Sequence, residues 1–184
     1  TPPSPTEYAE MVKRITSNRG CELVFEPGRV IVGNAGILVS RVLYIKKSAG
    51  HTFTVVDAAM NDLLRPSLYD AHHAIIPVKE VSDNANFLIT DIVGPICESG
   101  DVFAHGRLMP PLATDDILAI RTAGAYGAVM SSNYNSRPLA AEVLVNGDVF
   151  ETVRRHQTTE EMLALEEMPS WFDRHGIGRK QDVE

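Results

Sequence analysis

A thiol and two carboxylates lie within five residues of one another in a turn-rich stretch of this sequence. Cys97 is followed directly by Glu98, and Asp101 comes shortly after, in a segment that begins with Gly94-Pro95. A loop thiol with few apolar neighbours is typical of a reactive cysteine, since loops carry many catalytic groups. A partly buried structural cysteine fits the same residues equally well. The stretch alone leaves both interpretations open.

An arginine and a tyrosine spaced four residues apart form a second candidate, in the order Arg65 and then Tyr69. A guanidinium can hold a carboxylate through two parallel hydrogen bonds, and a phenol can add a third. The more ordinary interpretation is a surface arginine beside a half-buried tyrosine. Taken alone, the pair favours the ordinary interpretation.

Two glycine-containing turns could bind an anion. Glu26-Pro27-Gly28-Arg29 follows a short apolar run, and its glycine would let backbone N–H groups approach a phosphate. Tyr126 stands between Ala125 and Gly127, where small neighbours leave its hydroxyl free to reach a phosphate or a carboxylate. Because glycine is also the commonest turn residue, simple turns remain the alternative for both.

The elements that position these residues change in type along the chain. Ser4, Pro5 and Glu7 form a helix start of the capping-box kind, and we expect the helix to end near Gly20. The apolar run 21–25 then predicts a short strand ending at the Pro-Gly turn. Helix, strand and turn in this order indicate an α/β unit.

From about Ile37 the pattern is mostly β. We expect strands at 37–46, 52–57, 87–93, 117–123, 142–145 and 149–153. Short strands with frequent turns, including one at Asn146-Gly147, predict an antiparallel barrel or sandwich. Thr158 to Glu161 repeats the capping-box pattern and predicts a helix through Leu165, and the polar end after Gly176 is expected to be frayed.

Composition excludes several classes of protein. The chain has 184 residues, 44% of them hydrophobic, and a formal net charge of -7, which argues against a nucleic-acid binder. No apolar run reaches the roughly 20 residues of a membrane helix, so we expect a cytoplasmic protein with reduced cysteines. None of the six histidines pairs at the i, i+4 spacing of a zinc site. We therefore predict no metal.

Four motifs in this order resemble the signature of the diaminopimelate decarboxylase family, within the larger group of fold-type III pyridoxal-phosphate decarboxylases. The resemblance extends over most of the chain. The motifs are Glu26-Pro27-Gly28-Arg29, Asp57-Ala58-Ala59-Met60-Asn61-Asp62-Leu63-Leu64-Arg65-Pro66, Cys97-Glu98-Ser99-Gly100-Asp101 and Gly124-Ala125-Tyr126-Gly127.

This resemblance implies an architecture. Residues 1–36 would be the last α/β unit of a (β/α)₈ barrel that binds pyridoxal phosphate, and residues 37–184 a mainly antiparallel β-barrel or sandwich domain with a short terminal helix. The family forms head-to-tail homodimers that share active sites. The Schiff-base lysine lies upstream of anything in this chain, so we expect the chain to be the C-terminal part of a longer enzyme and inactive in isolation.

The resemblance also implies roles for individual residues. Cys97 would act from the neighbouring subunit and donate a proton to the carbanion left by decarboxylation, since a thiol with a reference pKa of ~8.5 is mostly protonated near neutral pH. The remaining candidates are assigned to the cofactor (Glu26, Gly28, Arg29 and Tyr126) and to the substrate (Arg29, Arg65, Tyr69, Glu98 and Tyr126).

The implied reaction is the decarboxylation of meso-2,6-diaminopimelate to L-lysine, the last step of lysine biosynthesis. The nearest alternatives are ornithine and arginine decarboxylases, in which an Asp usually follows the Cys. Glu98 and Arg65 favour diaminopimelate, because ornithine has no distal carboxylate for an arginine to bind. A non-catalytic ligand-binding or dimerisation β domain is the remaining alternative.

Overall fold

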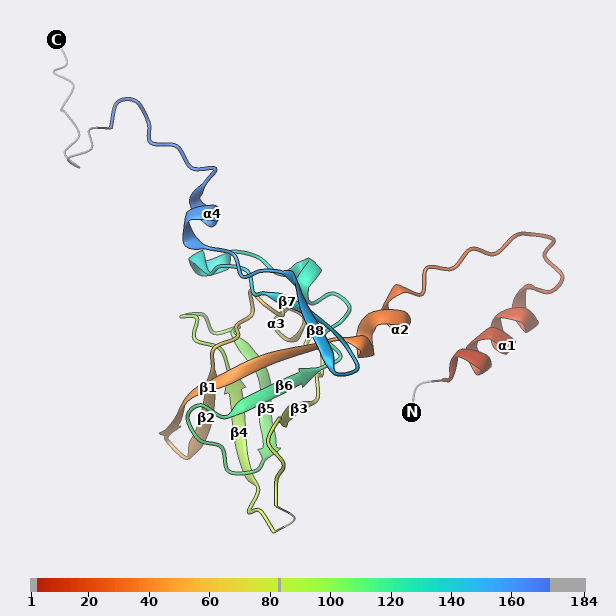
Figure 1. Cartoon of the computed structure of the whole chain (residues 1–184). Coiled ribbons are helices and arrows are strands. Elements are labelled where there is room, and N and C mark those ends of the chain that lie inside the picture. Colours follow the sequence, from red (N-terminus) through yellow and green to blue (C-terminus); the bar gives the residue numbers. More distant parts are fainter. Residues whose placement is uncertain (1–2, 83, 173–184) are drawn as a thin grey trace.

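The computed structural model describes residues 3–82 and 84–172 (Figure 1). Helix α1, Pro5–Thr16, begins at the expected capping box: Ser4 Oγ accepts from the backbone N–H of Glu7, and Glu7 Oε2 accepts from the backbone N–H of Ser4. No residue of α1 is buried, and Figure 1 shows the helix standing away from the sheet. The helix is therefore specified locally, by its caps and spacing.

The strand expected at residues 21–25 does not form, and this prediction was wrong. The segment has no regular structure and its side chains are exposed. A strand needs a neighbour for its backbone N–H and C=O groups, and within the described residues none pairs with it. Helix α2, Gly28–Val32, and a 3₁₀ turn at Gly33–Ala35 follow and lead into the sheet.

Six strands form one mixed sheet in the order β3-β6-β1-β2-β4-β5. All neighbouring pairs are antiparallel except β2 and β4, which are parallel, so the mainly antiparallel architecture is confirmed. The strands are β1 (Ile37–Ser48), β2 (His51–Val56), β3 (Ile75–Pro77), β4 (Leu88–Val93), β5 (Val102–Met109) and β6 (Ile117–Arg121).

The core lies between the curved strands and the segment that follows β2. Val42, Val56, Ile92 and Leu118 are almost fully buried, each from a different strand, and Leu63 joins them from the segment after β2. Burying one such aliphatic side chain stabilises a fold by about 1.5–3 kcal/mol. This core fixes the place of α3, Arg65–Tyr69, immediately beyond Leu63.

A separate hairpin of β7 (Glu142–Asn146) and β8 (Val149–Arg154) forms at the expected Asn-Gly turn. Helix α4, Thr159–Leu163, has the expected capping box at Thr158 but ends before Leu165. The prediction for residues beyond Gly176 lies outside the described part of the chain. The sheet begins at Ile37, and the assignment of residues 1–36 to a barrel stays a prediction.

Candidate functional site

Arg65, Tyr69 and Tyr126 lie together. The guanidinium carbon of Arg65 is 5.8 Å from the ring centre of Tyr69, four residues along α3, and 5.8 Å from that of Tyr126. Contacts of this kind at exposed sites contribute only about 0.5–1 kcal/mol, too little to hold a domain together but enough to orient a guanidinium. Both tyrosines are about half exposed, and Arg65 beside them is half-buried.

The loop that carries Tyr126 is held against the residues before the sheet. The backbone N–H of Ala123 donates to Gly36 O at 2.9 Å, and that of Gly124 donates to Gly33 O at 3.1 Å. A Cβ atom at Gly124 would lie 2.0 Å from Val32 O, so glycine is required for this approach. Tyr126 itself has φ of 55°, a left-handed conformation that is uncommon for a residue other than glycine.

Arg29 lies on α2, beside the base of this loop. A Cβ atom at Gly33 would contact both Arg29 Cγ and Thr122 Cγ2 at 3.7 Å, so the stem of Arg29 packs near the end of β6. The structure thus brings Arg29, on α2, to the base of the loop that carries Tyr126. Arg65, on α3, lies near the ring of Tyr126. Glu26 and Gly28 precede or begin α2 and are exposed.

Asp101 organises the loop that carries Cys97. Its buried carboxylate accepts from the backbone N–H of Met60 at 2.7 Å and of Ile96 at 2.8 Å. Burial raises the pKa of Asp101 above its ordinary value of 3.8, against the lowering effect of these two donors. A Cβ atom at Gly94 would lie 2.2 Å from the Asp101 carboxylate. Sequence reasoning placed Asp101 in the motif but gave it no role.

Cys97 and Glu98 project from this loop into solvent. Both are exposed, and Glu98 Oε2 accepts from the hydroxyl of Tyr134 at 3.4 Å. Neither residue shares a hydrogen bond, ion pair or aromatic contact with Arg65 or Tyr126 in residues 3–82 and 84–172. The predicted residues therefore form two groups: the cationic group of Arg29, Arg65, Tyr69 and Tyr126, and the thiol loop of Cys97 and Glu98.

Tyr134 was not singled out from the sequence, and its position depends on a buried polar network. Asn61 donates to Ser132 O at 3.2 Å, and Arg137 Nε donates to Asn61 Oδ1 at 2.9 Å. Arg137 also lies 3.7 Å from Asp62. Burial raises the pKa of Asp62 above its ordinary value of 3.8, against the lowering effect of the Ala59 N–H and the Arg137 charge. Such a network links residues far apart in sequence, and no local pattern marks it.

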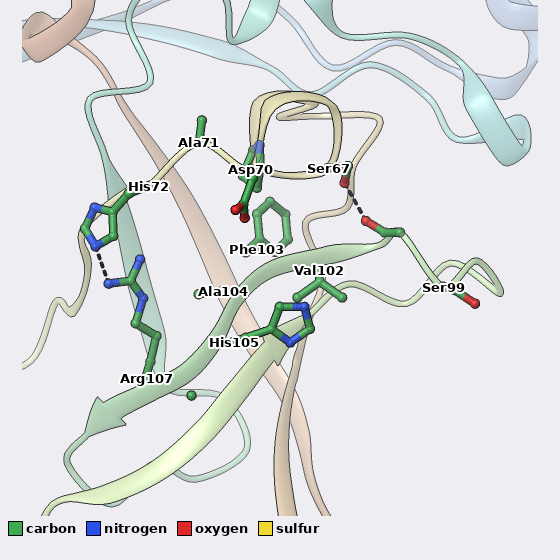
Figure 2. Close-up of a pocket in the computed structure, with 13 residues that line it drawn as sticks. Ser67, Asp70, Ala71, His72, Ser99, Val102, Phe103, Ala104, His105 and Arg107 are labelled. Atoms are coloured by element: carbon green, nitrogen blue, oxygen red, sulfur yellow. Dashed lines mark hydrogen bonds between the residues drawn. The ribbon is translucent and has the colours of Figure 1, made fainter.

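A pocket of about 590 Å³ lies beside these groups, between α3 and β5. Figure 2 shows His72 and Arg107 next to each other at one end and Ser99 at the other. Ser67 of α3 and Asp70, the residue directly after α3, line it, whereas Arg65 and Tyr69 do not. The helix thus presents its cation and its phenol to a different part of the surface.

Among the described residues, no three His, Cys, Asp or Glu side chains gather in a way that could hold a metal ion. The helices in the same part of the chain are all too short or too polar to cross a membrane.

The sequence model of one family, described as "Pyridoxal-dependent decarboxylase, C-terminal sheet domain", matches residues 16–124. The chain belongs to this family. The match runs from the end of α1 to the Tyr126 loop, and membership implies pyridoxal phosphate as the cofactor.

Similar proteins are diaminopimelate decarboxylases. Those of Zymomonas mobilis and Neisseria meningitidis are 49% and 50% identical over 93% and 86% of this chain. A structure of the Helicobacter pylori enzyme, complexed with L-lysine, covers 87% of the chain at 39% identity with a TM-score of 0.79. The chain spans about 40% of the length of these relatives.

The residues of this decarboxylase domain fit the phosphate of such a cofactor. Space around Gly28 is open, with no atom within 4 Å of an added Cβ, and Arg29 and Tyr126 are exposed. Backbone N–H groups, a guanidinium and a phenol are all hydrogen-bond donors, which suits an anion. This segment can therefore contribute hydrogen-bond donors to the phosphate of the cofactor.

Proposed function

We propose that this chain is the C-terminal part of a diaminopimelate decarboxylase that converts meso-2,6-diaminopimelate to L-lysine and carbon dioxide. The observation that carries the proposal is the placement of the Arg65 guanidinium carbon 5.8 Å from the ring centres of both Tyr69 and Tyr126. The identity of 49% to the Zymomonas mobilis enzyme supports it.

Substrate recognition follows from the charges. Diaminopimelate carries two amino-acid ends, one that reacts and one that must stay intact. Arg65 binds the carboxylate of the intact end through its guanidinium, and Tyr69 adds a hydrogen bond from its hydroxyl. Glu98 pairs with the ammonium of the same end. Ornithine and arginine lack this second carboxylate, so Arg65 discriminates against them.

At the reacting end, the cofactor phosphate is bound by Gly28, Arg29 and Tyr126, with Glu26 beside them. Two of these residues, Arg29 and Tyr126, also face the substrate. When bound, pyridoxal phosphate supplies a ring that takes up the electrons left as carbon dioxide departs. Cys97 then gives the proton of its thiol to the carbon that lost the carboxylate, and the resulting thiolate regains a proton from solvent.

The thiol loop acts on the site of a second copy in this proposal. Cys97 and Glu98 are exposed and belong to a loop fixed by Asp101, which suits insertion into a partner's site. Two copies related by a two-fold axis would each complete the other's cationic group. Residues 1–36 would finish an upstream barrel that carries the covalent lysine, and a cytoplasmic location is part of the same proposal.

The test is a substrate comparison with the complete enzyme, upstream barrel included. Carbon dioxide release is measured with meso-diaminopimelate, ornithine and arginine at equal concentrations, with and without added pyridoxal phosphate. We expect release from diaminopimelate alone and L-lysine in equal amount. Preferred release from ornithine or arginine would identify the alternative decarboxylase, and no release from any substrate would favour a non-catalytic domain.

A further inference from the structure

His73 is a buried titratable group that the proposed mechanism does not use. It is 3% exposed and lies between α3 and β3. Its ring Nδ1 lies 2.8 Å from Arg121 O, at the end of the strand that leads to the Tyr126 loop. Arg121 N also donates to Ala74 O at 2.8 Å. The side chain therefore connects the segment after Tyr69 to the segment before Tyr126.

The hydrogen bond to Arg121 fixes the tautomer of His73. A carbonyl oxygen only accepts hydrogen bonds, so Nδ1 carries the proton. In the neutral ring Nε2 then presents a lone pair, and this buried atom has no hydrogen-bond partner among the described residues. A buried acceptor without a partner costs free energy and is rare in folded proteins, which makes it a marker for a group that arrives later.

The surroundings of His73 are cationic. Burial lowers its pKa, and the charges of Arg65 on α3, of His72 beside it and of Arg29 on α2 act in the same direction, against the Arg121 hydrogen bond. Arg107 also donates to His73 O at 3.0 Å. Burial and these charges both disfavour protonation of the imidazole, and an unprotonated Nε2 near two arginines complements the N–H groups of a guanidinium.

We propose that His73 is a positioning residue for substrate recognition, and that its Nε2 accepts a hydrogen bond from the Arg65 guanidinium when the substrate carboxylate is bound. This inference rests on the proposed function, since it assigns Arg65 to that carboxylate. Arg65 donates no hydrogen bond in the described part of the chain, so at least one of its N–H groups is available while the others face the ligand. The guanidinium carbon lies 5.8 Å from the centres of both tyrosine rings, and His73 would fix the rotation of the guanidinium in its own plane.

Two substitutions separate this role from a structural one. His73→Asn keeps an amide N–H near Nδ1 for Arg121 O but has no acceptor at the Nε2 position. His73→Gln reaches further and places an amide oxygen near Nε2. Both lose the ring, so both lower the midpoint of thermal unfolding by a similar amount. His105→Asn serves as a control, because His105 is exposed and its ring hydrogen-bonds to Asp91 and to no other residue among 3–82 and 84–172.

The complete enzyme is assayed for KM, kcat and calorimetric affinity for L-lysine. We expect His73→Asn to raise KM and weaken L-lysine binding about ten-fold with little change in kcat, as for one charge-assisted hydrogen bond, and His73→Gln to recover most of the loss. Equal KM values for wild type and His73→Asn would overturn the proposal. Equal defects in both variants would assign His73 a structural role only. An inactive wild type would refute the proposed function instead, and the L-lysine affinities of the two variants would still decide on His73.

Discussion

The guanidinium of Arg65 and the ring of Tyr126 lie 5.8 Å apart, although β3, β4, β5 and β6 all separate them in the sequence. Arg65→Lys removes the planar fork that holds a carboxylate at two points and leaves a single ammonium. We expect KM for diaminopimelate to rise by roughly ten-fold or more, with thermal stability nearly unchanged, because the contact is only partly buried. Arg41→Lys, at an exposed ion pair with Asp115, should leave both quantities unchanged.

The two cysteines offer a matched pair, since both are exposed. In the complete enzyme Cys97→Ala should lower kcat by about 100-fold or more, the contribution typical of a positioned proton donor. Cys21→Ala should leave kcat unchanged. Neither substitution should shift the unfolding midpoint, because neither thiol is in the core. An unchanged kcat for Cys97→Ala would rule out the thiol as proton donor.

Asp101→Asn tests what holds the thiol loop. An amide can accept one of the two backbone N–H bonds, but its NH₂ group would face the other donor. We expect a loss of about 1–3 kcal/mol in unfolding free energy, and a lower kcat because Cys97 is displaced. Asp148→Asn, at an exposed turn, is the control for loss of charge. Denaturant unfolding of both variants gives the comparison.

The stability of the complete enzyme should depend on His73 near neutral pH. Its folded-state pKa is below the ordinary value of 6.5, so on acidification the unfolded chain binds a proton before the folded chain does. Stability contributed by His73 is complete above 6.5 and falls as the pH drops toward the lowered pKa. Thermal unfolding of wild type and His73→Asn across this window should show a shallower slope for the variant. Asp62 and Asp101 titrate in both proteins, so the difference isolates His73.

Short sequence motifs correctly predicted the helix starts and the hairpin turn, which depend on interactions between residues close in sequence. The capping boxes at Ser4 and Thr158 and the Asn146-Gly147 turn all form as expected. The prediction of a strand at residues 21–25 was wrong because a strand needs a neighbouring strand to pair with, which no local pattern reports. Strand β5 was missed because its pattern, Val102–Met109, includes His105, Gly106 and Arg107 at exposed or half-exposed positions. Helix α3 was missed because five residues are too few to show the helical repeat of apolar positions.

The site was predictable where residue types form motifs and unpredictable where tertiary contacts decide. The resemblance named Arg65, Tyr69 and Tyr126, and the structure brings these three together. It gave no role to Tyr134, whose hydroxyl reaches Glu98, or to the buried Nε2 of His73, which has no hydrogen-bond partner in the described part of the chain. Both depend on burial and on contacts between distant segments. The assignments to cofactor and substrate remain predictions.

In the proposed enzyme the cationic group and the thiol loop are two halves of one active site, contributed by two copies. It can be tested by mixing complete enzymes that carry either Cys97→Ala or Arg65→Ala, each of which we expect to retain little activity alone. After subunit exchange a heterodimer has one site with both residues intact, so random mixing should restore about a quarter of the wild-type rate. Recovery of lysine formation at that level is the predicted result. No recovery, with exchange verified by mass, would show that Cys97 and Arg65 act within the same copy and would contradict a shared active site.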